Sequence, residues 1–426
     1  MGLPDTEVVV IGAGLAGLNA ARLLGRSGHQ VVVLERDAVP GGRVRSARWA
    51  DCPIELGAAY FTADYARFIA LVEELGLADT AEPFPNAFRS EVLRDGRWRY
   101  VDYRSIPSFV RFGGIGLREK ASVSIVGLRS RTLHRRALRH FDLASAADVD
   151  RAAGQSATAL RYFYGLPFEA FCQYRAEQVS VALQEMTARY QGEPRKLREG
   201  LGVVPARLAE RLEVEYDTEA VAVEERDGRA VVRLASGGEI VARACVVATP
   251  GDVAARLAGT GGYPASVRYT PFAELLLRTS EPVARRSPSG EPLYMRLIPP
   301  GEREGTLHSL VYLDHVAPSG GLVLAAPAPG GRLADRPDDE LADSLQAQAE
   351  ELHPRIEVVD RRLVRGERMV PLFEPGRAGR LRAFRESLRP APVDLAGDWL
   401  YGPTMESALE AGEAAAERVG RRLQPD

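Results

Sequence analysis

The chain has 426 residues, 45% of them hydrophobic and 27% charged, which is typical of a globular protein with two or three domains. Its net charge of −3 gives no reason to expect a nucleic acid as partner. No apolar run is long enough to span a membrane, and no signal peptide precedes the first predicted strand, so we expect a cytoplasmic protein.

The N-terminal segment predicts a strand, a glycine-rich turn and a helix. The stretch Glu7–Gly17 begins with apolar residues typical of a buried parallel strand, and a helix is predicted over Leu15–Arg26. Glycines in such a turn let the backbone approach a pyrophosphate, whose charge the helix N-terminus stabilises. The predicted nucleotide contacts in this turn are Gly12, Ala13, Gly14, Leu15, Ala16 and Gly17.

A second strand and an acidic residue complete this unit. Gly28 ends the helix, Gln30–Leu34 predicts another buried strand, and Glu35 stands where an acid binds ribose hydroxyls, followed by Arg36. A carboxylate there repels a 2′-phosphate, which favours FAD or NAD over NADP. The alternative, a glycine-rich surface turn, does not explain the complete strand–turn–helix–strand order.

The middle of the chain changes its pattern twice. Asp64–Leu75 predicts an amphipathic helix, residues 91–200 are expected to be mostly helical, and a helix is predicted over Val204–Leu212. Strands then return, interrupted by one further helix at Asp338–Leu352. The predicted strands are Ala220–Val223, Ala230–Leu234, Cys245–Pro250, Val267–Thr279, Leu293–Ile298, Thr306–His315, Leu322–Ala325 and Ile356–Val364.

Three other glycine-bearing segments have the residue types of one family. The first is Val39–Ser46 with Gly41, Gly42 and Arg43, the second is Ile54–Tyr60, and the third is Val393–Ala408 with Gly397 and Asp398. On these segments the chain resembles the flavin-containing amine oxidase superfamily, which includes protoporphyrinogen oxidases and phytoene desaturases. Most of that family has glycine where this chain has Ser407 and Glu410.

The resemblance implies FAD as the cofactor. It places the backbone of Gly41, Gly42 and Val44 near the flavin and the guanidinium of Arg43 on the pyrophosphate, where a planar fork can donate to two oxygens. Asp398 would reach the ribityl and phosphate region, and a helix starting near Met405 would stabilise negative charge on the flavin N1–O2 edge. The remaining implied contacts are Leu56, Gly57, Ala58, Ala59, Ala220, Val221, Ala248, Thr249, Gly397, Thr404 and Ala408.

The cysteines indicate how the flavin is held. Cys52, Cys172 and Cys245 are far apart and odd in number, so they form neither a disulfide framework nor a metal site. Some family members tether flavin through a cysteine shortly before the last strand. The matching stretch, residues 371–385, has none, so we expect noncovalent FAD and no metal.

The predicted fold class is α/β, with a Rossmann-type FAD-binding domain of the amine-oxidase type and a substrate domain. Residues 1–90, 201–266 and 386–426 are expected to form the first domain. Residues 91–200 and 267–385 are expected to form the second, helical in its first part and a mixed β-sheet in its second.

Candidate catalytic residues come from two strands of the substrate domain. Arg296, and His308 with Tyr312, lie on strand faces that mix polar and apolar residues, whereas the opposite faces are apolar and are assigned to a core. The mixed faces are interpreted either as a cavity wall above the flavin or as solvent-exposed surface. In the first case His308 is a proton acceptor.

The position of the lysines separates this chain from amine oxidases proper. Only Lys120 and Lys196 are present, and neither lies on the strands that carry the lysine facing flavin N5 in many amine oxidases. Arginine cannot replace that lysine as a base because its pKa keeps it protonated. Lys196 is interpreted as a surface charge, and the resemblance leans toward protoporphyrinogen oxidases and desaturases.

A basic segment at residues 101–140 carries nine Arg or Lys and two acidic residues, with apolar residues interleaved. It could contact an anionic membrane surface, but a solvated helix pair in an arginine-rich protein is the favoured interpretation. Only one dinucleotide motif is present, so a separate NAD(P)H site is not expected.

The predicted function is FAD-dependent removal of hydride from a small-molecule C–H next to nitrogen or carbon, by amine oxidation or desaturation. Oxygen is the expected acceptor, giving hydrogen peroxide, and the alanine- and arginine-rich composition is associated with bacterial specialised metabolism. Two alternatives remain open at this point. One is a flavin-dependent isomerase or mutase without net redox change, and the other is a noncatalytic binding protein of the same fold.

Overall fold

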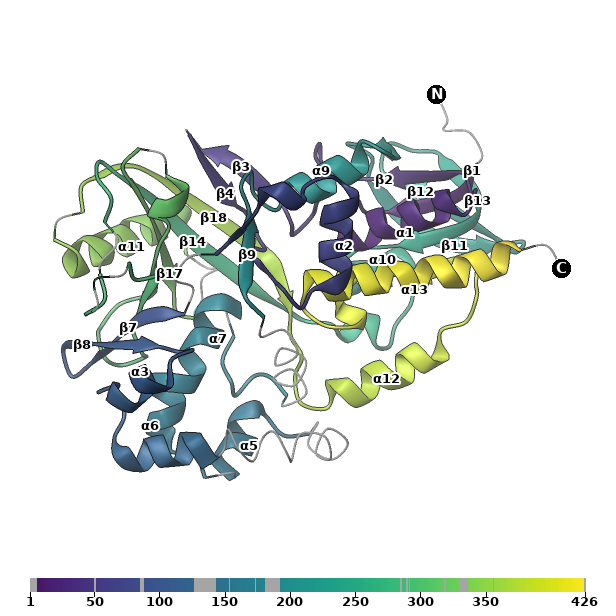
Figure 1. Ribbon diagram of the computed structural model, residues 1–426. Coiled ribbons are helices and arrows are strands. Elements are labelled where there is room, and N and C mark those ends of the chain that lie inside the picture. Colours follow the sequence, from purple (N-terminus) through teal and green to yellow (C-terminus); the bar gives the residue numbers. More distant parts are fainter. Residues whose placement is uncertain are drawn as a thin grey trace.

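A sheet assembled from distant parts of the chain carries the glycine-rich turn. The computed structural model describes all residues except 1–5, 50, 85–87, 126–142, 153, 173, 181–191, 284–285, 289, 291, 318, 330–335, 355 and 425–426. The sheet has the order β10-β2-β1-β13-β12-β11, with β19 also paired to β13 (Figure 1). Its parallel strands are β1 (Thr6–Ile11), β2 (Val31–Leu34), β10 (Glu213–Glu215), β13 (Glu239–Val247) and β19 (Val393–Leu395), and β11 (Ala220–Arg226) and β12 (Arg229–Leu234) are antiparallel.

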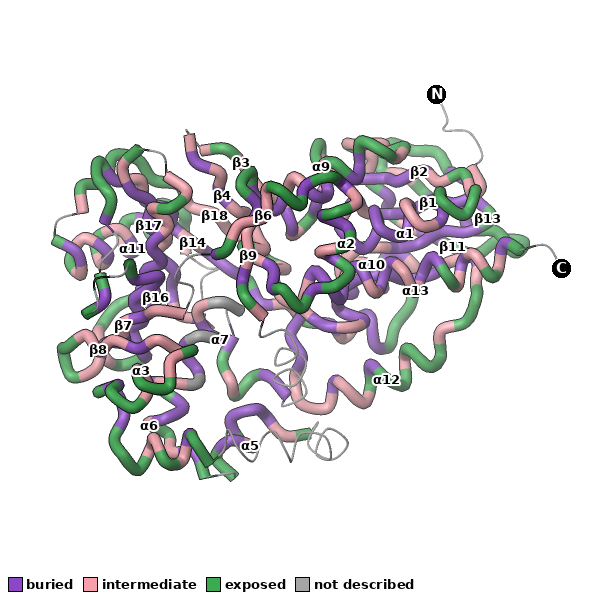
Figure 2. The backbone as a smooth tube through the Cα atoms, viewed as in Figure 1, coloured by how far each residue is buried: buried purple, intermediate pink, exposed green. Residues whose placement is uncertain are grey.

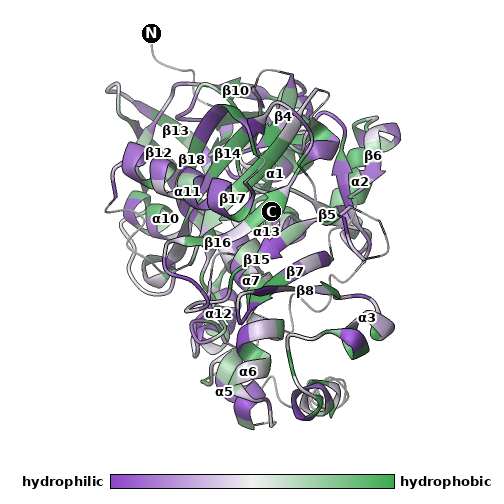
Figure 3. Ribbon diagram, turned by 90° about the vertical axis from the view of Figure 1, so that its left-hand side faces the viewer, coloured by the Kyte–Doolittle hydropathy of each residue, from purple (hydrophilic) through white to green (hydrophobic). Residues whose placement is uncertain are grey.

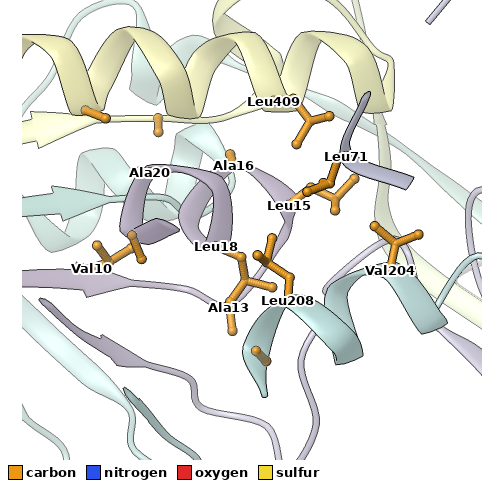
Figure 4. Close-up of a cluster of buried hydrophobic side chains, with 14 of the residues drawn as sticks. Val10, Ala13, Leu15, Ala16, Leu18, Ala20, Leu71, Val204, Leu208 and Leu409 are labelled. Carbon is orange, nitrogen blue, oxygen red and sulfur yellow. The ribbon is translucent and has the colours of Figure 1, made fainter. Parts of the chain in front are cut away.

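Helices from both ends of the chain cover one face of this sheet. Helix α1 (Leu15–Arg26) lies along α13 (Met405–Leu423), and Asn19 Nδ2 donates to the Leu409 carbonyl at 2.8 Å. Leu15 and Leu18 of α1 meet apolar side chains from α2 (Ala66–Glu74), α9 (Val203–Ala209) and α13, as Figure 4 shows. The strands between the layers are buried along most of their length (Figure 2). This core holds the turn between β1 and α1 in place.

The opposite face of the sheet carries a second core. Helix α10 (Gly251–Leu257) and helix α12 (Arg377–Ser387) contribute to it, and Trp399 is fully buried within it. Coverage of both faces explains why residues 8–11 of β1 and 244–247 of β13 are continuous apolar runs rather than alternating ones.

The second large sheet is mixed and confirms the predicted β-sheet of the other part of the molecule. Its order is β18-β14-β17-β16-β15-β7-β8, and only β15 and β7 pair in parallel. The bounds are β18 (Val358–Pro371), β14 (Tyr269–Thr279), β17 (Gly321–Pro327), β16 (Leu307–Tyr312), β15 (Met295–Leu297), β7 (Arg89–Arg94) and β8 (Arg97–Asp102).

Helix α11 (Asp338–Leu352) covers one face of the mixed sheet. Leu341 and Leu345 are fully buried against apolar residues of β14, β16 and β17. The helix shows both hydrophilic and hydrophobic stretches, as expected for a surface helix with one buried face (Figure 3). The α/β fold class is therefore confirmed.

The expectation that residues 91–200 are mostly helical is wrong at the start of that range. Strands β7 and β8 form a hairpin whose turn residues Asp95 and Gly96 have φ values of 51° and 70°, the type I′ conformation that suits two-residue turns. The remaining described elements there are α3 (Ile106–Arg111), α5 (Ala146–Ala152), α6 (Ala157–Ala159), α7 (Gly165–Cys172) and β9 (Pro194–Leu197). Two small sheets join β3 (Ser46–Trp49) to β4 (Cys52–Glu55), and β9 to β5 (Phe61–Thr62) and β6 (Ala81–Pro83).

Residues 126–140 of the basic segment lie outside the described residues. In its described part, Ile106, Val110 and Leu117 are exposed, on and beyond α3. Across the described part of the chain, no helix has both the length and the apolar composition that crossing a membrane requires.

Candidate nucleotide and substrate site

One cavity of about 1470 Å³ runs along the C-terminal edge of the parallel strands and under the mixed sheet. This exceeds the roughly 300–1,000 Å³ of an ordinary small-molecule site and leaves room for a dinucleotide together with a substrate. The predicted cofactor residues that line it are Gly12, Gly14, Leu15, Ala16, Glu35, Arg36, Gly41, Gly42, Arg43, Val44, Gly57, Ala58, Ala59, Ala220, Val221, Ala248, Thr249, Gly397, Asp398, Thr404, Met405 and Ala408.

The glycine segments meet at close range. Gly14 and Gly41 form an isolated parallel bridge, and a Cβ on Gly42 would lie 3.7 Å from the Gly14 Cα. Gly12 and Gly41 have φ values of 104° and 111°, which favour glycine. A Cβ on Gly14 would have no heavy atom within 4 Å, so open space adjoins the N-terminus of α1. Such a cradle fits the pyrophosphate of FAD.

Three predicted residues do not line the cavity, each for a local reason. Ala13 is fully buried, and its N–H donates to Glu35 Oε2 at 2.7 Å. Gly17 faces the turn, where an added Cβ would lie 2.0 Å from the Gly12 carbonyl oxygen. The side chain of Leu56 packs against the small core around Cys52 and Ile54.

Glu35 is fixed by the backbone around it. Besides Ala13, the N–H of Asp37 donates to Glu35 Oε1 at 3.0 Å, and the residue is 8% exposed. A carboxylate has about four acceptor positions, so two remain for ribose hydroxyls.

Arg43 and Asp398 join the second and the last segment through a bidentate ion pair. Arg43 Nη1 and Nη2 donate to the two carboxylate oxygens of Asp398 at 2.7 and 2.8 Å, and Nη1 also donates to the Met369 carbonyl at 3.1 Å. The guanidinium stands 5.6 Å from the ring centre of Tyr269. Both residues line the cavity, so the pair joins two of the glycine-bearing segments at its wall.

The N-terminus of α13 is capped rather than bare. The Thr404 hydroxyl accepts from the Ser407 N–H at 3.0 Å, and the Glu406 carboxylate accepts from the N–H groups of Arg67 and Phe68 in α2. Ser407 therefore fits the cap where the family has glycine, and Met405 and Ala408 still line the cavity.

The wall of the substrate end is the apolar face of the mixed sheet. Phe272, Leu276, Met295, Val311 and Leu324 line the cavity from four of its strands. This face was assigned to a core in the sequence interpretation.

His308, Tyr312 and Arg296 lie neither in the cavity wall nor on the solvent-exposed surface, so both interpretations of the mixed strand faces are wrong. Tyr312 lies in the core beneath α11, and Arg296, which is 1% exposed, donates to Glu91 Oε2 at 2.9 Å. His308 is paired with Glu169 at 3.1 Å, at a point where the register of β16 against β17 shifts. Both faces of β16 are buried, so alternation could not tell cavity from core.

We expect His308→Gln to leave the rate of substrate oxidation within about threefold of the parent protein, because a positioned acid or base contributes roughly 10²–10⁴-fold and this one does not reach the cavity. Stopped-flow kinetics on the variant checks this. A loss of a hundredfold or more with unchanged thermal stability would restore His308 as a catalytic residue.

Lys196 and His315 are among the charged or titratable residues of the cavity that the sequence interpretation missed. Lys196, interpreted as a surface charge, lines the cavity from β9 and lies 3.7 Å from Glu82 Oε2. His315 also lines it, and burial, with Lys196 as a second cause, lowers its pKa to about 4. His315 is therefore neutral near pH 7. It lies within the helical turn Asp314–Val316, which follows the apolar strand β16.

Two carboxyl groups of the cavity wall have strongly shifted pKa values. Burial raises the pKa of Glu55 to about 7, although the Ser46 hydroxyl and the Leu201 N–H both donate to it and lower it. Burial alone raises the pKa of Glu274 to about 7. Glu274 was missed because it is the single acidic residue of a mainly apolar strand.

The shifted pKa of Glu55 predicts a pH-dependent stability. Between about pH 4.5 and 7 the folded state holds a proton that the unfolded state has lost, so the free energy of unfolding falls as the pH rises. We expect Glu55 to lower the free energy of unfolding by about 3 kcal/mol between pH 4.5 and pH 7, and we expect Glu55→Gln to lack this loss. Urea unfolding of both proteins at pH 5 and pH 8 measures it. Equal pH dependence in the two proteins would contradict the assignment.

Comparison with known proteins gives the family. The model of the family described as "Flavin containing amine oxidoreductase" matches residues 15–420. The putrescine oxidase of Kocuria rosea is 47% identical over 74 residues, which are 17% of this chain and 15% of that protein, so this local match spans a small part of its length.

Solved structures share the fold over nearly the whole chain. A triple mutant of putrescine oxidase superposes with a TM-score of 0.81 at 17% identity, covering 98% of this chain and 99% of that one. A fatty acid isomerase from P. acnes superposes with a TM-score of 0.73 at 17% identity, covering 97% and 99%. These identities establish the fold alone, whereas the family model spans almost all of the sequence. The chain belongs to the flavin-containing amine oxidoreductase family.

Proposed function

We propose that this protein is an FAD-dependent oxidoreductase that oxidises a small amine by removing hydride from the carbon next to nitrogen. The observation that carries the proposal is the continuity of the cavity. The glycine cradle and the Arg43–Asp398 pair occupy one part of it, and an apolar and aromatic wall from the mixed sheet encloses another part. We further propose that the two sheets mark the two predicted domains, with FAD held noncovalently between them.

The residues of the cradle would bind the nucleotide. Gly12, Gly14 and the N-terminus of α1 would receive the pyrophosphate, and Glu35 would accept from the ribose hydroxyls. When bound, FAD supplies a ring that accepts hydride from a substrate C–H. The segment Gly57–Ala59, which lines the cavity, is where the family resemblance puts that ring.

The substrate end excludes water and orients the reacting carbon. Tyr60, Phe84 and Tyr294 form a chain of ring contacts, with centroids 5.9 and 5.4 Å apart, and all three line the cavity. Enclosure and orientation of this kind can lower a barrier by about 7–11 kcal/mol. With oxygen as the acceptor, each amine oxidised would consume one O2 and release one hydrogen peroxide.

The purified protein is expected to be yellow, and an oxidisable amine is expected to bleach it without oxygen. Benzylamine, cyclohexylamine and putrescine form a first panel, read by flavin absorbance and, in air, by oxygen uptake with peroxide release. A colourless protein that FAD cannot reconstitute would overturn the proposal. Turnover of a substrate without oxygen uptake or bleaching would favour an isomerase.

A further inference from the structure

Glu274 is a single acidic residue in an otherwise apolar part of the cavity wall. It lies on β14 between Phe272 and Leu276, and the three residues line the cavity together. Leu275 and Leu277 point to the opposite side, into the core beneath α11. The alternation of the strand therefore directs the carboxyl group into the cavity.

The carboxyl group of Glu274 has no hydrogen-bond donor or cation paired with it among the residues that the structure describes. Other buried or half-buried acids there do have partners: Glu35 with Ala13, Glu55 with Ser46, Glu91 with Arg296, Glu169 with His308, Asp394 with Arg418, Asp398 with Arg43, and Glu406 with Arg67. A carboxylate in an apolar wall is costly unless something pairs with it. A bound ligand could therefore supply the partner of the Glu274 carboxyl group.

The position of Glu274 is close to the predicted flavin ring. Burial raises the pKa of Tyr294, and electrostatic interactions with Tyr60 and with Glu274 raise it further. Tyr60 directly follows Gly57–Ala59, the segment assigned to the isoalloxazine. Glu274, Tyr294 and Tyr60 therefore bound one compartment at the junction of nucleotide and substrate.

The rest of this compartment suits an apolar body that carries a cation. Phe84 contacts Tyr294 edge-on, and Phe88, Tyr103 and Phe163 also line the cavity. Aromatic faces attract ammonium groups and pack against rings and alkyl chains. His315 is neutral, and the charge of Lys196, which also lines the cavity, is offset by Glu82, whose Oε2 lies 3.7 Å from the Lys196 Nζ.

We infer that Glu274 receives the ammonium group of the substrate and takes one of its protons, so that this site selects hydrophobic or aromatic primary and secondary amines. The inference rests on the proposed function and adds its substrate class and proton acceptor.

The step balances in protons and electrons. An N–H bond of the ammonium breaks and an O–H bond forms on Glu274, which leaves a neutral amine with a free lone pair. The C–H electron pair would then leave as hydride to bound FAD, the two-electron acceptor of the proposed function, while the lone pair forms the C=N bond. A carboxyl group with a pKa near 7 suits this transfer, because it is partly ionised in the free protein and its pKa is closer to that of an ammonium group than the pKa of an ordinary carboxyl group is.

The test compares Glu274→Gln with the parent holoenzyme, using Glu281→Gln as the matched control. Glu281 is exposed just beyond the end of the same strand, so this control removes an equal charge outside the cavity. Benzyltrimethylammonium, a cation without an N–H proton, and benzyl alcohol, a neutral probe, are titrated against the flavin spectrum. We expect Glu274→Gln to weaken binding of the cation at least thirtyfold, with binding of the alcohol changed less than threefold.

A second readout addresses the proton. In anaerobic stopped-flow reduction by benzylamine, the parent rate should rise through an apparent pKa near 7, and this step should be absent in Glu274→Gln. Glu274→Asp, which keeps the charge, should restore part of the cation affinity. FAD content and melting temperature must match the parent for each variant, and Glu274→Ala replaces any variant that does not fold.

The outcomes separate the inference from the proposed function. Unchanged binding of the cation in Glu274→Gln, or equal losses for cation and alcohol, would overturn the role of Glu274 while amine oxidation could still stand. Cation binding that depends on Glu274, in a protein that no amine reduces, would overturn the proposed function and the proton transfer and leave only the ammonium site.

Discussion

Gly14→Val is expected to give a folded protein that no longer retains FAD. A Cβ at Gly14 would have no heavy atom within 4 Å, and φ there is −75°, so the new Cβ meets open space and the backbone is not strained. The same space adjoins the N–H groups at the start of α1, where a pyrophosphate would lie. We expect the affinity for FAD to fall at least about 1000-fold, which corresponds to about 4 kcal/mol.

The matched control is Gly25→Val. Gly25 belongs to the same helix, is exposed, and also has open space at its Cβ, but it lies at the other end of α1 and outside the cavity lining. Calorimetric titration of the apoproteins with FAD, together with thermal unfolding, distinguishes the variants. A yellow Gly14→Val protein with parental affinity would exclude the turn as the nucleotide cradle. Gly17→Ala, whose Cβ would meet the Gly12 carbonyl, should destabilise the apoprotein as well.

Local sequence signals predicted the nucleotide half of the molecule well because its turns and strands depend on local chemistry. Gly12 has a positive φ, and β1 is apolar on both faces. Gly41 lies where the chain passes beside Gly14 and forms a β-bridge with it. The β7–β8 hairpin was missed although Asp95-Gly96 is a strong signal for a two-residue turn.

The substrate half depends on long-range packing that sequence patterns do not contain. All six residues of β16 are buried, so only the docking of α11 decides that Tyr312 belongs to the core and Val311 to the cavity. Glu274 was overlooked for a related reason. A lone acid in a strand is ordinarily solvent-facing, and only the pairing of β14 between β17 and β18 places this half-buried side chain in the cavity wall.

Breaking the Arg43–Asp398 pair should have a large effect on stability and on FAD binding. The side chain of Asp398 is 10% exposed, so Arg43→Leu leaves a nearly buried carboxylate without its two charged donors. Removing one partner of a buried pair costs about 3–5 kcal/mol, and the 32% exposure of Arg43 places the expected loss of unfolding free energy near the lower end. Urea unfolding of the apoprotein measures this loss, and Arg226→Leu, in a solvent-exposed ion-pair cluster, is the control.

The double variant Arg43→Leu with Asp398→Asn distinguishes the effect of the ion pair on stability from its effect on FAD binding. Because it removes both charges, we expect it to recover at least half of the stability that Arg43→Leu loses, which gives a clear coupling free energy between the two positions. It should nevertheless fail to retain FAD, since neither a cation for the pyrophosphate nor a carboxylate for the ribityl chain remains. Additive losses in the double variant would mean that the pair contributes little to folding. Full retention of FAD by that variant would mean that this corner of the cavity does not hold the nucleotide. The two readouts are independent because stability is measured without FAD and affinity is measured on the folded apoprotein.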